Sequence, residues 1–168
     1  MPHRRTARLA AWQLWLLTLS GGGLWLSGSA WLLLHYYGQT EGEFGPQMNP
    51  LEPDMLTVHG FMLIPVLLGI GGMFVAHIPH GWSHRHQRIA GVVLGVVLAV
   101  LIVSGYLLYY LGDEDWRSWA SLGHWGLGLL LPLAFVWHYI NGQKARRRPT
   151  RRPPNGQSGR QEIRGQAG

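Results

Sequence analysis

Residues 121–142, SLGHWGLGLLLPLAFVWHYING, contain no Asp, Glu, Lys or Arg but carry two histidines, His124 and His138. An ionisable side chain is costly inside a bilayer, so a histidine within a membrane segment points to a function. The two histidines are fourteen residues apart, and fourteen residues of α-helix turn through about 1400°, about 40° short of four full turns, so both imidazoles leave one face. The rise between them is about 21 Å. In a hydrocarbon core about 30 Å thick, one histidine then lies near each surface.

Three further segments have the same apolar character. The four predicted spans cover residues 9–37, 55–78, 89–111 and 119–140. Each is long enough to cross a bilayer, which takes about 20 apolar residues, and each is predicted to be helical because a spanning segment must satisfy its own backbone. The predicted fold class is therefore all-α, a four-helix transmembrane bundle within residues 1–142. Residues 143–168 are rich in Arg, Pro, Gly and Gln and are predicted to be a disordered tail.

The charges are segregated along the chain. The N-terminus, the loop between the second and third spans, and the tail carry net charges of +3, +2 and +7, whereas the other two loops together carry −6. Positive loops stay in the cytoplasm, so both termini are predicted to be cytoplasmic and the acidic loops external. The basic tail has no aromatic interleaving and no nucleic-acid-binding motif, so the predicted partner is the lipid bilayer and not a nucleic acid.

This topology sorts the other membrane histidines by depth. His59 lies just inside the outer end of the second span and His77 lies at its inner end, eighteen residues further on. Eighteen residues make about five full turns, so these two also share a face. His59 therefore has the depth of His124, and His77 that of His138. Two helices that each carry an outer and an inner histidine predict two bis-histidine iron sites, which is the axial ligation that two haems need.

The absence of cysteine excludes covalent haem attachment, so any haem is of the b type. Two points stay open. The rise from His59 to His77 is about 27 Å, which exceeds the 21 Å estimated for the fourth span. Either Pro65 and nearby glycines bend the helix, or the inner haem is tilted, or His35 from the first span replaces His59 at the outer iron. Arg117, the one basic residue on the outer side, either pairs with haem propionates or is a plain interfacial arginine.

Two smaller patterns bear on the same question. Glycines flank the outer histidines and would leave room for a macrocycle, although small residues also serve ordinary helix packing; they are Gly60, Gly123, Gly126 and Gly128. The loop between the second and third spans carries His80, His84 and His86. Histidines on an undefined loop are weak evidence for a metal site, so a solvated loop is the favoured interpretation.

These residues resemble the membrane di-haem cytochrome b type, which includes the cytochrome b subunits of formate dehydrogenases and hydrogenases and the small four-helix superoxide oxidase. The likeness covers roughly residues 9–142, and His124 and His138 match the histidine pair of the last helix in that type. The chain departs from it in the first span, whose inner end reads LAAWQLW without a histidine, so that His77 of the second span takes this place. The stretches NPLEPDMLTVHG, SGYLLYYLG and HWGLGLLLPLAFVWH also resemble an uncharacterised bacterial membrane family with a cytochrome-b-like fold.

The resemblance implies a multi-pass protein of the bacterial inner membrane that holds two b haems. It also implies electron transfer across the membrane between the quinone pool and a redox partner protein. Whether the chain is itself a quinone-linked oxidoreductase or an electron-transfer subunit of one is left open. The contrasting hypothesis is a non-redox membrane protein, either a histidine-lined metal carrier or an assembly partner. A carrier needs polar ligands around a midplane cavity, whereas the midplane residues here are glycine and aliphatic.

Overall fold

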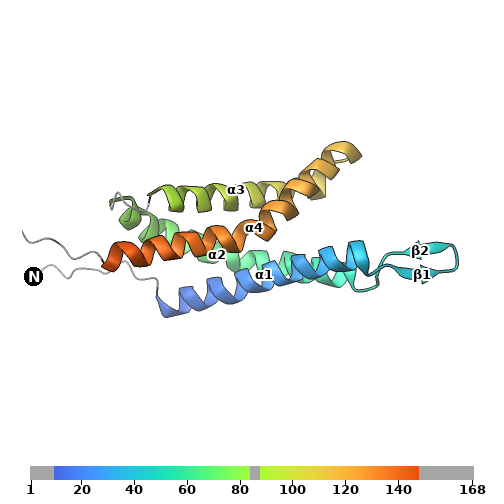
Figure 1. Cartoon of the computed structure of the whole chain (residues 1–168), viewed down its shortest axis with the longest axis horizontal. Helices are drawn as coiled ribbons and strands as arrows, with labels where there is room; N and C mark the ends of the chain where they lie inside the picture. Colours follow the sequence, from blue (N-terminus) through green and yellow to red (C-terminus); the bar gives the residue numbers. More distant parts are fainter. Residues whose placement is uncertain (1–9, 84–87, 148–168) are drawn as a thin grey trace, which may run out of the picture.

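The structure is a computed structural model that describes residues 10–83 and 88–147. It consists of four long helices and one small β-hairpin. In chain order the elements are α1 (Ala11–Tyr37), β1 (Thr40–Gly42), β2 (Gly45–Gln47), α2 (Glu52–Ser83), α3 (Arg88–Tyr110) and α4 (Glu114–Arg147). Figure 1 shows the β-hairpin projecting at one end of the molecule, which we call the outer end, while the start of α1 and the end of α4 lie at the opposite, inner end.

All four helices are long and apolar enough to cross a membrane, by their length and composition. Among the described residues, the only buried apolar side chains are Val66 and Ala90. Most large apolar side chains therefore face outward, which is the distribution that a lipid environment stabilises and water does not. The prediction of four apolar helices is confirmed, and the chain has the build of a multi-pass membrane protein.

Two helices, α2 and α4, extend beyond their predicted spans at both ends, whereas α1 and α3 agree with theirs to within two residues. The fourth begins at Glu114 because Asp113 caps it, with its Oδ1 atom accepting the backbone N–H of Trp116 at 3.0 Å. At the other end, α4 continues past the predicted boundary at residue 142 and ends at Arg147, and the Gln143 amide donates to the Tyr139 hydroxyl at 3.0 Å. The first part of the predicted tail is thus helical, and residues 148–168 lie outside the described residues.

The outer connection between α1 and α2 is more ordered than the sequence indicated. Strands β1 and β2 pair antiparallel, with Gly42 opposite Gly45, and Gly45 takes a positive φ of 111° at the turn, a conformation that glycine adopts without strain. Asn49 then starts α2, since its side-chain oxygen accepts the N–H of Leu51 at 3.0 Å while its amide donates to the Gly38 carbonyl at 2.7 Å. This ties the beginning of α2 to the end of α1.

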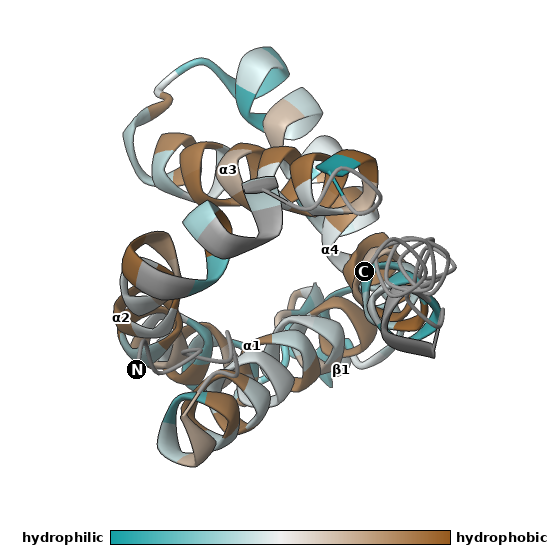
Figure 2. Ribbon diagram, turned by 90° about the vertical axis from the view of Figure 1, so that its left-hand side faces the viewer, coloured by the Kyte–Doolittle hydropathy of each residue, from teal (hydrophilic) through white to brown (hydrophobic). Residues whose placement is uncertain are grey.

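The bundle is built from two helical hairpins. The α1 helix packs along α2, and α3 packs along α4, whereas contacts between the two hairpins are few. Figure 2, which looks along the bundle, shows the four helices arranged around a common centre. Small residues bring α1 and α2 together: a Cβ atom at Gly23 would lie 3.0 Å from the sulfur of Met62, and one at Gly69 would lie 2.5 Å from a methyl group of Leu17. Such close approach is the usual basis of helix packing in membranes.

Candidate functional site

Two pairs of histidines face each other across the boundary between the helical hairpins. At the outer pair, the ring centroids of His59 on α2 and His124 on α4 lie 6.2 Å apart, with an angle of 74° between the ring planes. At the inner pair, His77 on α2 and His138 on α4 are also 6.2 Å apart, at 72°. The structure therefore brings together the same histidines that depth-counting had paired. Whether these histidines bind iron stays a prediction.

The separation within each pair suits two ligands of one metal ion. An imidazole nitrogen lies about 2.0 Å from a metal that it ligates and about 1.1 Å from the centroid of its own ring, so two opposed ligands place their centroids about 6.2 Å apart. The same distance and the ring angles of 74° and 72° also lie within the range of about 4.5 to 7 Å that edge contacts between rings span.

The hydrogen bond of the first outer histidine determines which ring nitrogen carries its proton. The Nδ1 atom of His59 lies 2.9 Å from the carbonyl oxygen of Leu24 and 3.3 Å from the hydroxyl of Ser27, both on α1. A carbonyl oxygen only accepts hydrogen bonds, so Nδ1 must be the donor and Nε2 is left without a proton. An unprotonated Nε2 is the form of histidine that ligates a metal.

The second outer histidine is held in the same way by the other hairpin. The Ser104 hydroxyl on α3 lies 3.3 Å from the Leu101 carbonyl and 2.9 Å from the Nδ1 atom of His124. When the hydroxyl donates its single proton to the Leu101 carbonyl, its oxygen is free to accept from Nδ1–H, and in that tautomer Nε2 is unprotonated. An acceptor on the far ring nitrogen is the usual accompaniment of a metal-ligating histidine.

At the inner pair, one ring nitrogen lacks such a partner. The Nδ1 atom of His138 is buried and makes no hydrogen bond to the described residues. Gly91 of α3 lies beside this ring, and its neighbour Ala90 is buried. A buried polar nitrogen without a partner costs about 1–3 kcal/mol, so Nδ1 of His138 is less well satisfied than Nδ1 of either outer histidine.

Glycines on the neighbouring helices let the imidazoles approach closely. A Cβ atom at Gly28 of α1 would lie 2.9 Å from the Cε1 atom of His59, one at Gly105 would lie 3.1 Å from Cε1 of His124, and one at Gly91 would lie 3.6 Å from Cε1 of His138. Larger residues at the first two positions would displace the rings. By contrast, a Cβ atom at Gly123 or Gly126 meets nothing within 4 Å, so these glycines leave open space beside the helix.

The residues that hold the outer rings were missed from the sequence. The pattern L-x-x-S-G occurs three times, as Leu17 to Gly21 and Leu24 to Gly28 in α1 and as Leu101 to Gly105 in α3. In the last two copies, the serine contacts a histidine Nδ1 atom and the glycine lies against the same ring. In the first copy, the Ser20 hydroxyl bonds the Leu16 carbonyl and a Cβ atom at Gly21 would meet nothing within 4 Å, so the pattern alone does not identify the histidine contacts.

Among the described residues, His35 does not face another histidine; it contacts Glu52 and Trp31. Its Nδ1 atom lies 3.0 Å from a carboxylate oxygen of Glu52, whose side chain is only 3% exposed, and its ring stacks on Trp31 with centroids 4.8 Å apart. The other Glu52 oxygen accepts the backbone N–H of Asn49 at 3.3 Å. His35 therefore joins the end of α1 to the start of α2, and the histidine that faces His124 is His59.

Arg117 lies in α4 and is exposed. Within residues 10–83 and 88–147, the only ion pair is that of His35 with Glu52, so Arg117 makes none there. Its predicted role toward propionates stays a prediction.

A conventional metal cage is absent from the described part of the chain. No group of three or more His, Cys, Asp or Glu side chains there is arranged to hold a metal ion. Of the loop histidines, His84 and His86 lie outside the described residues, and the side chain of His80 is not described. Each candidate site therefore offers two protein ligands, one from α2 and one from α4.

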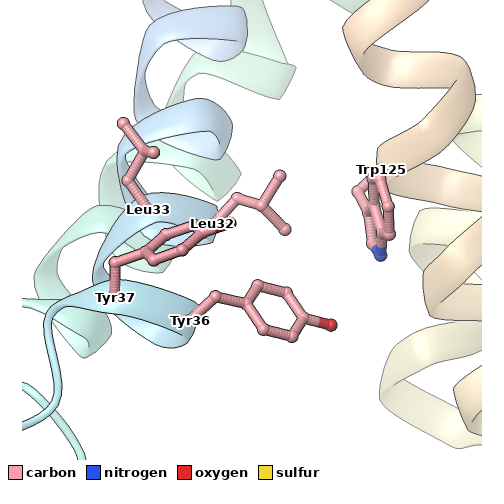
Figure 3. A pocket seen from close by; sticks show the side chains of 5 residues that line it. All are labelled: Leu32, Leu33, Tyr36, Tyr37 and Trp125. Carbon is pink, nitrogen blue, oxygen red and sulfur yellow. The ribbon is translucent and has the colours of Figure 1, made fainter.

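A mostly apolar groove lies between α1 and α4. It has a volume of about 380 Å³ and is lined by Leu32, Leu33, Tyr36, Tyr37 and Trp125. Figure 3 shows the Tyr36 hydroxyl directed across the groove from α1 toward Trp125 on α4. Trp125 directly follows His124 in the sequence, but neither His124 nor His59 is among the residues that line the groove.

Compared with models of protein families, with curated proteins and with solved structures, the chain shows no match. The functional argument therefore depends on the geometry of the two histidine pairs.

Proposed function

We propose that the chain is a membrane cytochrome that holds two b haems and carries electrons across the bilayer between the quinone pool and a redox partner protein. His59 and His124 are the axial ligands at the outer end, and His77 and His138 at the inner end. The observation that carries the proposal is the 6.2 Å separation of ring centroids at both pairs, which suits two imidazoles on one metal.

The small number of protein ligands points to haem and not to a bare metal ion. Structural zinc takes four ligands, and transition metals generally need four or more. Each pair here supplies two, and the described residues contain no group of three, so the remaining ligands must come from a bound group. A porphyrin supplies four nitrogen ligands and leaves two axial positions, which suits a pair of histidines on opposite helices. The same count disfavours the metal-carrier hypothesis.

The chain's own residues would orient the ligands and keep water away. Nδ1–H of His59 donates to the Leu24 carbonyl, and that of His124 donates to Ser104, which turns both Nε2 atoms away from α1 and α3. Gly28 and Gly105 allow the rings to sit against the neighbouring backbone. When bound, each haem would accept and release one electron.

The quinone part of the proposal is supported by the groove between α1 and α4 that Trp125 lines. Ligand pockets are mostly apolar with a few polar groups that fix orientation, and this groove combines leucine and tryptophan side chains with the hydroxyl groups of Tyr36 and Tyr37. A quinol head is a polar ring on an apolar tail, so its chemistry matches this lining. We further propose that the protein lies in the bacterial inner membrane with both termini cytoplasmic, because its basic loops all belong to the inner end.

Haem content tests the proposal directly. The protein purified in detergent should contain about two b haems per chain by the pyridine haemochrome assay, since two bis-histidine sites are present. The His124→Ala, His138→Ala double variant, which removes one ligand from each pair, is the control and should lose most of the haem. A folded wild-type protein that contains no haem, even when expressed with excess haem, would overturn the proposal.

A further inference from the structure

Helix α3 offers two similar contacts to the two histidines of α4. Ser104 and Gly105 lie against His124. Fourteen residues earlier Gly91 lies beside His138, and Ala90 precedes it in the sequence as Ser104 precedes Gly105. Because α3 and α4 are antiparallel neighbours, a step of fourteen residues along one matches the step of fourteen along the other. The two contacts differ at one position, which carries a hydroxyl group in the outer copy and a methyl group in the inner copy.

This difference decides whether the far nitrogen of each ring is hydrogen-bonded. At the outer position, the Ser104 oxygen accepts Nδ1–H of His124 at 2.9 Å. At the inner position, Ala90 is 4% exposed and cannot accept, and Nδ1 of His138 is buried without a partner among the described residues. A hydrogen bond that Nδ1–H donates raises the basicity of Nε2. A more basic axial ligand favours the oxidised iron and so lowers the reduction potential.

The charges at the two ends act in the same direction. The outer end carries Arg117 and seven carboxylates, namely Glu41, Glu43, Glu52, Asp54, Asp113, Glu114 and Asp115. The inner end of the described chain instead carries Arg88 and Lys144. Negative charge near a redox centre opposes the addition of an electron, and positive charge favours it. The outer centre should therefore be the harder of the two to reduce.

We infer that Ser104 is a positioning residue that lowers the reduction potential of the outer centre by accepting Nδ1–H of His124, and that Ala90 leaves the inner centre at a higher potential. An electron in the protein then rests at the inner end. This inference rests on the proposed function, since it requires a redox centre at each pair.

Spectroelectrochemical titration of the haem-loaded protein tests the inference through the midpoint potentials. The wild type should show two waves. Ser104→Ala should shift the lower wave to more positive potential, because the outer ligand loses its acceptor. Ala90→Ser should shift the upper wave to more negative potential, since it introduces a hydroxyl oxygen that can accept Nδ1–H of His138. Each variant thus brings the two waves closer together.

Two further variants separate the hydroxyl from packing effects. Ser104→Thr keeps the hydroxyl and should keep the wild-type potentials. Ser20→Ala removes another buried serine of a membrane helix, one whose hydroxyl bonds only within α1, and should shift neither wave. Two haems whose potentials do not move in Ser104→Ala would overturn the inference while leaving the proposed function intact, as would a shift of the upper wave or an equal shift in Ser104→Thr. Absence of haem from the wild type would instead overturn the proposed function.

Discussion

At the residue scale, an imidazole can ligate a metal only through a nitrogen that carries no proton. For His59, a backbone hydrogen bond determines which ring nitrogen carries the proton, because the Leu24 carbonyl at 2.9 Å can only accept from Nδ1. His35 is in a different situation, since its Nδ1 atom lies against the buried Glu52 carboxylate. The sequence alone leaves His59 and His35 as alternatives for the outer site. The partner of the Nδ1 atom distinguishes them, a carbonyl for His59 and a carboxylate for His35.

Alanine variants of these two histidines should behave differently. His59→Ala removes an axial ligand, so the outer haem should become high-spin or be lost. His35→Ala should keep two low-spin haems, because that side chain is engaged by Glu52 and Trp31. Electron paramagnetic resonance of the oxidised proteins measures the spin states. A high-spin signal from His35→Ala together with an unchanged His59→Ala spectrum would mean that the ligand comes from α1.

The glycine beside His124 makes a second prediction at this scale. A Cβ atom at Gly105 would lie 3.1 Å from the His124 ring, whereas one at Gly95, on the same helix, would meet nothing within 4 Å. Gly105→Leu should therefore displace the imidazole and lower the haem content from about two per chain toward one, the number left when one bis-histidine site is lost. Gly95→Leu is the matched control and should retain both haems. Equal losses in the two variants would show that α3 tolerates no large residue at either place, and that the ring contact is irrelevant.

At the element scale, the two histidine-bearing helices meet in register although their spacings differ. The paired histidines are eighteen residues apart on α2 and fourteen apart on α4, yet both pairs have the same centroid separation. Each helix contains an internal proline between its histidines, Pro65 in α2 and Pro132 in α4, where a helix can bend. A difference of about 6 Å in straight-helix rise therefore does not prevent either pair from forming.

Helix geometry explains why so much of this site could be predicted. Rise and turn per residue are constant, so the depth and face of His59, His77, His124 and His138 follow from counting residues. The contacts of Ser104 and the other α1 and α3 residues depend on how each helix is rotated about its own axis, and single-span hydropathy does not determine that rotation. The β-hairpin was missed because strands of three residues carry too little alternation to be recognised.

The Glu52 carboxylate should stabilise the junction between the end of α1 and the start of α2. The Glu52 side chain is 3% exposed and contacts His35 of α1 and the backbone N–H of Asn49, so its removal deletes two hydrogen bonds at the junction of α1 and α2. We expect Glu52→Ala to lower the free energy of unfolding by about 1 kcal/mol, the net contribution of an intramolecular hydrogen bond or two, measured by thermal unfolding in detergent. Asp54→Ala, an exposed acidic position two residues further on, should have little effect. Equal destabilisation by both variants would contradict a specific role of Glu52 at the junction of α1 and α2.

At the scale of the whole molecule, the two helical hairpins touch little except where the histidines meet. A group that binds histidines from both hairpins binds only the assembled bundle, and such binding stabilises the fold by mass action. Under the proposed function, haem would be a structural link between α1–α2 and α3–α4 as well as a redox centre.

Removal of haem should therefore loosen the bundle. Binding to the folded state alone adds about 4 kcal/mol when free ligand is a thousandfold above its Kd, so protein produced under haem limitation should unfold at a clearly lower temperature than loaded protein. Added haem should restore the transition in the wild type but not in the His124→Ala, His138→Ala double variant. Identical unfolding temperatures with and without bound haem would show that the hairpins associate without its help.

The charge pattern predicts the orientation of the whole molecule in the membrane. The N-terminus, the α2–α3 connection and the residues after α4 are basic, whereas both connections at the outer end are acidic, and lysine and arginine are retained on the cytoplasmic side. A reporter that is active only in the periplasm should be inactive when fused after Ile140 and active when inserted after Glu43. A cytoplasm-dependent reporter should give the reverse pattern. If the fusion after Ile140 were active in the periplasm, the outer pair of histidines would face the cytoplasm, and the low-potential centre inferred for Ser104 would then deliver electrons outward instead of inward.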